Sequence, residues 1–209
     1  MRHDPTTILT HRASRRLLVP LGLLWLGLVG LLFAWTGRFS LAAVLDACGT
    51  EAPDVLFAPS PARTESFLAG CGAPGLQAYR DLQVVDVFYP AVGAAFLAVA
   101  LTLLLRDASP RLWWLAVVPV AAALGDYVEN AAAWVLIGAG PSAIPWVAVP
   151  LQVGSGAKVI LSWVSWLAVV TLLLGRVPMV RHRVAGRRAA RSDRPRPARP
   201  TRTVADLST

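Results

Sequence analysis

The sequence contains few charged residues and few of the residue types that most enzymes use in catalysis. Of 209 residues only 15% are charged, whereas 56% are hydrophobic, a balance outside the range of soluble domains. Its three histidines, His3, His11 and His182, all fall outside the long apolar runs. Serine–histidine catalysis within a membrane and a His-Glu-x-x-His metal site are therefore excluded. A lipid bilayer is the simplest solvent for such a chain.

Metal, cofactor and nucleic-acid sites also lack their usual signals. The only two cysteines, Cys48 and Cys71, have no accompanying histidines and do not indicate a zinc site. The stretch 154–158 has neither the spacing nor the following Ser or Thr of a phosphate loop. The net charge of +8 comes from arginines near helix ends and in one tail, so it forms no folded basic face. The sequence predicts no metal, no cofactor and no nucleic-acid partner.

Four apolar runs are long enough to cross a membrane, which takes about 20 residues. They cover residues 17–35, 84–105, 112–137 and 153–174. The first run follows three arginines, as in a signal peptide, but it is long for that role and no small-x-small cleavage site follows it. We interpret it as an uncleaved signal anchor. The sequence therefore predicts an all-α membrane protein with a four-transmembrane-helix antiparallel bundle.

The positions of the basic residues predict the orientation, because cytoplasmic flanks carry the excess of Lys and Arg. With the N-terminus inside, sixteen arginines are cytoplasmic: six ahead of residue 176, and ten from Arg176 to Arg202. Only Arg38, Arg63 and Arg80 fall outside. We expect a multi-pass protein of a bacterial-type plasma membrane with both termini cytoplasmic and residues 1–16 as a short flank. The basic segment 176–209 is predicted to be disordered, and either binds anionic lipid headgroups or only halts translocation.

The outer segments differ in length and composition. Residues 36–83 contain both cysteines and are predicted to form a small folded cap. A disulfide there would close a loop of about 24 residues and contribute ~3 kcal/mol, and the alternative is two unpaired, small hydrophobic side chains. Residues 138–152 have three prolines and no charge. This connection is expected to lie in the interface or to dip into the protein, because unpaired backbone cannot face lipid.

Acidic and amide side chains occur inside the third apolar run. Asp126, Glu129 and Asn130 are spaced i, i+3 and i+4, which places them on one helix face. Counted from residue 137 at 1.5 Å per residue, Asp126 lies about 16 Å deep and Glu129 about 12 Å. At that depth they must face protein or trapped water. We expect the two carboxylates to hold at least one proton and to titrate as a unit.

The neighbouring runs add further polar side chains. Lys158 is the only lysine of the chain; it either faces the bundle, where it could lose its proton, or extends outward to the interface. The candidate ligand or proton site consists of Asp86, Tyr89, Asp126, Tyr127, Glu129, Asn130 and Lys158. All belong to the outer half of three consecutive helices, which predicts a polar chamber that opens outward. The alternative is that these groups are interhelical hydrogen bonds worth about 0.6 kcal/mol each.

The segment Asp126-Tyr-Val-Glu-Asn, together with Lys158 and the segment Asp86-Val-Phe-Tyr-Pro, resembles a family of uncharacterised bacterial four-helix integral membrane proteins. The resemblance covers the second to fourth helices. It implies the topology and no particular activity. A looser likeness is to four-helix membrane enzymes that isomerise sterols with intramembrane carboxylates, although this chain has no histidine in any predicted helix.

Three functions are compatible with these patterns. In the first, the chamber binds or transports a small cation, a proton or an amphiphile, and a transport role would require a homo-oligomer. In the second, the protein is an intramembrane enzyme that acts on a lipid or isoprenoid, with Asp126 or Glu129 as general acid or base and Lys158 holding a polar head. In the third, it is a non-catalytic subunit whose polar face docks on a helix of a partner membrane protein.

Overall fold

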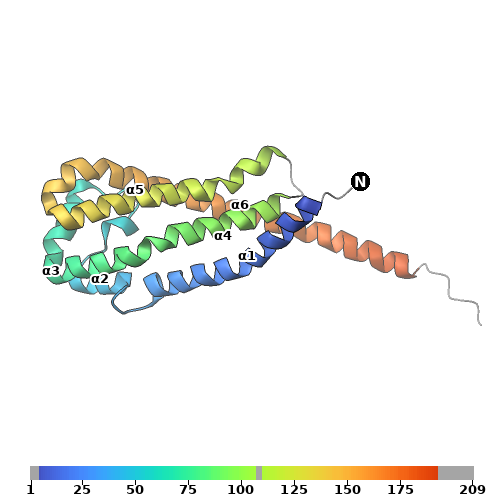
Figure 1. Ribbon diagram of the computed structural model, residues 1–209, viewed down its shortest axis with the longest axis horizontal. Helices are drawn as coiled ribbons and strands as arrows, with labels where there is room; N and C mark the ends of the chain where they lie inside the picture. The colour runs from blue at the N-terminus through green and yellow to red at the C-terminus, as the bar shows by residue number, and fades with distance from the viewer. Residues whose placement is uncertain (1–4, 107–109, 193–209) are drawn as a thin grey trace, which may run out of the picture. The chain divides into compact units, whose positions relative to one another are not determined.

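The computed structural model describes residues 5–106 and 110–192, and in these ranges every regular element is helical (Figure 1). The α-helices are α1 (Pro5–Val29), α2 (Leu41–Cys48), α3 (Pro61–Asp86), α4 (Phe88–Leu105), α5 (Val118–Ala139) and α6 (Ile144–Ser192). Shorter helical turns join them: η1 (Gly30–Ala34), η2 (Pro53–Val55), η3 (Pro110–Ala116) and η4 (Gly140–Ala143). The all-helical prediction is confirmed for the described residues.

Three helical stretches are long and apolar enough to cross a membrane. They are Arg15–Ala34, Pro61–Leu105 and Arg111–Arg176. The third stretch contains two of the predicted spans, and the chain turns between them at Gly140, whose φ of 66° favours glycine. Figure 1 shows α5 and α6 running in opposite directions on either side of this turn.

Two predicted boundaries differ from the structure. The helix expected from residue 112 begins as η3, and α5 proper starts at Val118, with Pro119 in its first turn. Proline is tolerated there because the first amides of a helix have no partner within the helix. The connection 138–152, which was expected to lie in the interface or to dip into the protein because of unpaired backbone, is helical; it is formed by the end of α5, by η4 and by the start of α6. A helix satisfies its own backbone groups, so this connection needs no burial to pair them.

The C-terminal segment also differs from its prediction. The chain divides into two units, Met1–Leu172 and Leu173–Thr209. In the second unit α6 continues to Ser192, although a disordered tail was predicted from residue 176. Alanine and arginine, which are frequent in this stretch, are both strong helix formers. The rest of the predicted tail, residues 193–209, lies outside the described residues.

Within Met1–Leu172, α1 packs along α4, and α4 packs along α5 (Figure 1). Trp25 of α1 joins the long helices: its ring stacks on Phe96 with centroids 5.8 Å apart and lies 5.3 Å from the ring of Trp166 in α6. Further along α4 and α6, a buried aliphatic cluster contains Leu97, Leu101, Leu105 and Val169. Aromatic and aliphatic contacts thus hold this end of the unit together.

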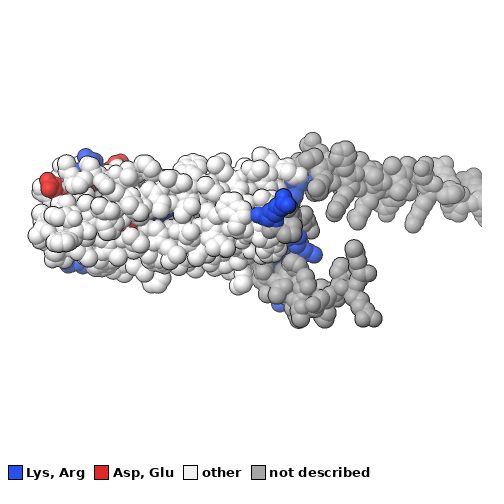
Figure 2. All heavy atoms as spheres, turned by 90° about the horizontal axis from the view of Figure 1, so that it is seen from above, with Lys and Arg blue, Asp and Glu red and all other residues white. Residues whose placement is uncertain are grey.

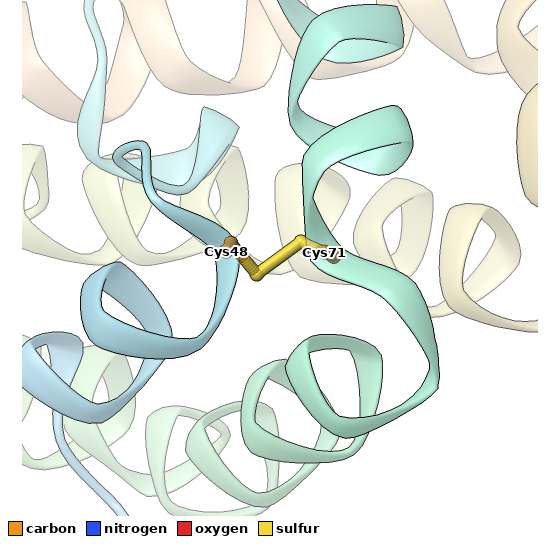
Figure 3. The surroundings of a disulfide bond; sticks show 2 residues. All are labelled: Cys48 and Cys71. Atoms are coloured by element: carbon orange, nitrogen blue, oxygen red, sulfur yellow. A yellow bond between two sulfur atoms is a disulfide. The ribbon is translucent and has the colours of Figure 1, made fainter.

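The predicted cap, residues 36–83, is folded and consists of α2, η2 and most of α3. In Figure 1 it lies at the end of the long helices away from the start of α1. The predicted disulfide is confirmed: Cys48 at the end of α2 is bonded to Cys71 in α3 (Figure 3). Gly75 makes the close packing of these two helices possible, since a Cβ at this position would lie 2.7 Å from the Cys48 sulfur. Arg38 further ties the cap together through a 2.7 Å ion pair with Asp81.

The surface of the long helices is apolar. Figure 2 shows charged side chains at the two ends of the visible face and almost none between them. Large side chains on these helices are more than half exposed, among them Leu23, Leu124, Trp163 and Leu167. Contiguous apolar surface of this kind is rare on soluble proteins, and it agrees with membrane association.

Candidate functional site: an acid-rich chamber

Helices α5 and α6 approach each other closely at two glycines. A Cβ on Gly154 would lie 2.7 Å from the carbonyl oxygen of Gly125, and a Cβ on Gly125 would lie 3.1 Å from the carbonyl oxygen of Gly154. Small residues at a helix crossing allow backbones this close together, as is common between membrane helices. Because the helices are antiparallel, Glu129 lies beside Gly154 and Lys158 lies beside Gly125. The side chains of Glu129 and Lys158 meet across this crossing.

The meeting of these helices forms a charge cluster of Asp126, Glu129 and Lys158. The Lys158 ammonium pairs with Oε2 of Glu129, whose side chain is fully buried. It also lies 3.4 Å from Oδ1 of Asp126. Of the two positions considered for Lys158, the structure shows the one that faces the protein interior.

The cap closes over the charge cluster through a third contact of the same lysine. Lys158 donates a 2.8 Å hydrogen bond to the backbone carbonyl oxygen of Asp54 in η2. Ser155, also in α6, donates to the carbonyl oxygen of Leu56, and Gln83 of α3 donates to Oδ2 of Asp54 at 2.6 Å. Lys158 thus hydrogen-bonds to Asp126 and to the Asp54 backbone and forms an ion pair with Glu129.

Beside the charge cluster lies a cavity of about 310 Å³, which we call the chamber. Three carboxylates from three different elements line it: Asp54, Asp86 and Asp126. Its aromatic walls are Phe33, Tyr89, Trp163 and Trp166. Phe33 and Trp163 are 56% and 65% exposed, so the chamber opens on the apolar flank of the protein between η1 and α6.

Some hydrogen-bond acceptors of the chamber have no donor among the described residues. Asp54 is only 5% exposed, and its Oδ1 has no hydrogen-bond partner among the described residues. Asp86 is near the amide of Asn130 but has no cation within ion-pairing distance in the described part of the chain. Burial raises the pKa of Asp54, an effect that the charge of Lys158 opposes. The acidic side chains thus outnumber the cations that could neutralise them.

The structure brings four of the seven predicted site residues to the chamber wall: Asp86, Tyr89, Asp126 and Lys158. Glu129 and Asn130 are buried behind it, and neither polar atom of the Asn130 amide has a hydrogen-bond partner in the described ranges. Tyr127 does not line the chamber; its hydroxyl donates to the carbonyl oxygen of Val87 at 2.9 Å.

Sequence reasoning missed Asp54, Gln83 and the tryptophans Trp163 and Trp166 of α6. Asp54 lies in the cap, outside every apolar run, so its position in the sequence gives no indication of its depth. Trp163 and Trp166 are spaced i and i+3 and follow Ser162 closely. Trp166 is four residues after Ser162 and shares its helix face, and Trp163 shares a face with Trp166, which was the available signal.

The burial and spacing of the acidic side chains also bear on two other kinds of site, a docking face for a partner helix and a metal site. Asp126, Glu129 and Asn130 are at most 7% exposed, so they are already enclosed and do not offer a polar face to a partner helix. Among the described residues no group of three or more His, Cys, Asp or Glu side chains could hold a metal ion. The chamber carboxylates therefore do not converge as metal ligands do.

Comparison with protein-family models, with curated proteins and with solved structures found no match to this chain. Its function is therefore inferred from the geometry of the chain itself.

Proposed function

We propose that the protein crosses a bacterial-type plasma membrane four times as an antiparallel bundle, with both termini cytoplasmic and the cap outside. Exposed arginines support this orientation: Arg15 and Arg16 precede the first span, and Arg106 and Arg111 flank the connection between α4 and α5. Such residues favour the cytoplasmic side. In this orientation the chamber lies in the outer half of the bilayer, beneath the cap.

Within this topology, we propose that the chamber binds a small organic cation that competes with protons. The observation that carries the proposal is the imbalance of charge around Lys158. Asp54, Asp86, Asp126 and Glu129 surround this single ammonium group, so the formal charge is −3 when all are ionised. Lys158 already contacts Asp54, Asp126 and Glu129. The buried polar atoms left without a hydrogen-bond partner among the described residues are chiefly acceptors, which suit a donor or a cation.

An ammonium ion fits these walls better than a metal ion does. Aromatic faces attract organic cations, with contributions that grow when the cation is desolvated. Tyr89, Trp163 and Trp166 bring such rings next to the acidic groups. Protons compete for the same oxygens, since a buried excess of carboxylates lowers its charge by taking them up.

The test is the binding of methylammonium to the detergent-solubilised protein, measured by calorimetry. We expect Asp86→Asn to weaken binding about tenfold or more, the equivalent of about 1.4 kcal/mol. Glu65→Gln, a change at an exposed carboxylate of α3, is the control and should bind as the parent does. Absence of methylammonium binding by the parent, or equal binding by Asp86→Asn, would contradict the proposal.

A further inference from the structure

A second, smaller cavity adjoins the chamber, and we call it the slot. Its volume is about 80 Å³, and it shares Tyr89, Asp126, Ser162 and Trp166 with the chamber walls. Among its described lining residues, the acidic and hydroxyl-bearing side chains all belong to this shared set. Beyond them the slot is lined by apolar side chains of α1, α4 and α5.

Small side chains from two helices, α4 and α5, line the slot. Ala94 of α4 and Ala122 and Ala123 of α5 line it, together with Trp25 of α1 and Leu97 of α4. Gly93 allows the Trp25 ring to pack here, because a Cβ at that position would lie 3.2 Å from the indole nitrogen. The slot is thus a narrow apolar extension of an acidic chamber.

From the junction of these two cavities we infer the class of ligand: an aliphatic primary amine, with its ammonium group in the chamber beside Asp126 and its carbon chain in the slot. The placement of the ammonium group in the chamber rests on the proposed function. The placement of the carbon chain depends on the slot. Beyond the shared residues, its described lining has no charged or hydroxyl-bearing side chain to solvate a second polar group. An 80 Å³ space takes only a few groups of the size of water, which occupies about 30 Å³ in the liquid. The chain that fits is therefore short.

The experiment is a chain-length series from methylammonium to hexylammonium, titrated into the solubilised protein at one pH. Each methylene that enters the slot should tighten binding about fourfold, and the gain should stop after about three methylenes, when the slot is full. An affinity that does not change with chain length would overturn the inference.

Variants that fill the slot provide the second half of the test. Ala94→Val and Ala122→Val should each remove most of the chain-length dependence and leave the methylammonium affinity within about twofold, since neither residue lines the chamber. The matched control is Ala95→Val, because Ala95 is the more exposed neighbour of Ala94 on the same helix and does not line the slot. It should keep the full chain-length dependence.

The two proposals fail in different ways. If the parent does not bind methylammonium, the proposed function is wrong. If methylammonium binds, but both slot variants keep the chain-length dependence of the parent, the slot does not hold the chain and only the further inference is wrong. Two variants on different helices are used because overpacking can unfold either one, and the series on the parent is a test without any substitution.

Discussion

Lys158 joins three parts of the molecule through one ammonium group. It belongs to α6, pairs with Glu129 and Asp126 of α5, and donates to the Asp54 backbone in the cap. Composition made this lysine conspicuous as the only one of the chain. The structure explains the residue type, since a compact ammonium with three protons can serve three acceptors in different directions.

We predict that Lys158→Met destabilises the protein. The substitution leaves the fully buried Glu129 without its counter-charge, and breaking a buried ion pair from one side costs about 3–5 kcal/mol. The free energy of unfolding in detergent measures the effect. Glu129→Gln combined with Lys158→Met should recover most of the loss, whereas a single variant as stable as the parent would contradict the assigned pairing.

Asp54 should make the stability of the cap depend on pH. Burial raises its pKa in the folded protein above the value in the unfolded chain. Its contribution to stability is therefore complete below the unfolded pKa and is lost as the pH rises through the folded pKa. Asp54→Asn should accordingly become more stable relative to the parent as the pH increases.

Thermal unfolding of the parent and Asp54→Asn across the acidic and neutral range checks this prediction. The amide can still accept the hydrogen bond of Gln83. Asp46→Asn, a change at an exposed carboxylate of α2, is the control. A stability difference between parent and Asp54→Asn that is constant with pH would show that the buried carboxylate does not titrate as described.

At the scale of helices, the crossing of α5 and α6 positions the charge cluster. Gly154→Ala places a Cβ 2.7 Å from the Gly125 carbonyl oxygen, and overpacking of this kind costs about 1–3 kcal/mol. Gly138→Ala is the matched control on α5, because nothing lies within 4 Å of its new Cβ. We expect the control to unfold at the parent temperature or above it, and Gly154→Ala to unfold below it. Equal unfolding temperatures would mean that the helices do not cross at this glycine.

Helical periodicity predicted part of the site and could not predict the rest. It placed Asp126, Glu129 and Asn130 on one face of α5, and all three are buried. It could not distinguish Asp126, which reaches the chamber, from Glu129, which lies behind it. That distinction depends on the glycine crossing of two helices, and periodicity describes only one helix at a time.

The cap was predicted only in outline for a similar reason. Its two cysteines and its prolines indicated a folded loop with a disulfide, which the structure confirms. The contact between Asp54 and Lys158 joins residues 104 positions apart. A loop has no period from which such a pairing can be read, so Asp54 remained unnoticed.

For the molecule as a whole, the proposed four-span topology predicts which positions are accessible from outside the cell. A membrane-impermeant maleimide should label Ser66→Cys in the cap and Ser142→Cys between α5 and α6 in intact cells, since both side chains are exposed. Arg111→Cys should react only after the membrane is permeabilised. The native pair Cys48 and Cys71 is bonded and should give no background. Labelling of Arg111→Cys in intact cells would contradict the orientation.

If the chamber exchanges protons for a cation, binding of the cation should release protons. Calorimetric titration of methylammonium in two buffers of different ionisation enthalpy counts the protons released per cation bound. We predict release of up to about one proton between about pH 5 and pH 8, because a bound cation favours the ionised form of the carboxylates beside it, and a smaller release by Asp86→Asn. Binding with the same enthalpy in both buffers throughout this range would contradict the exchange.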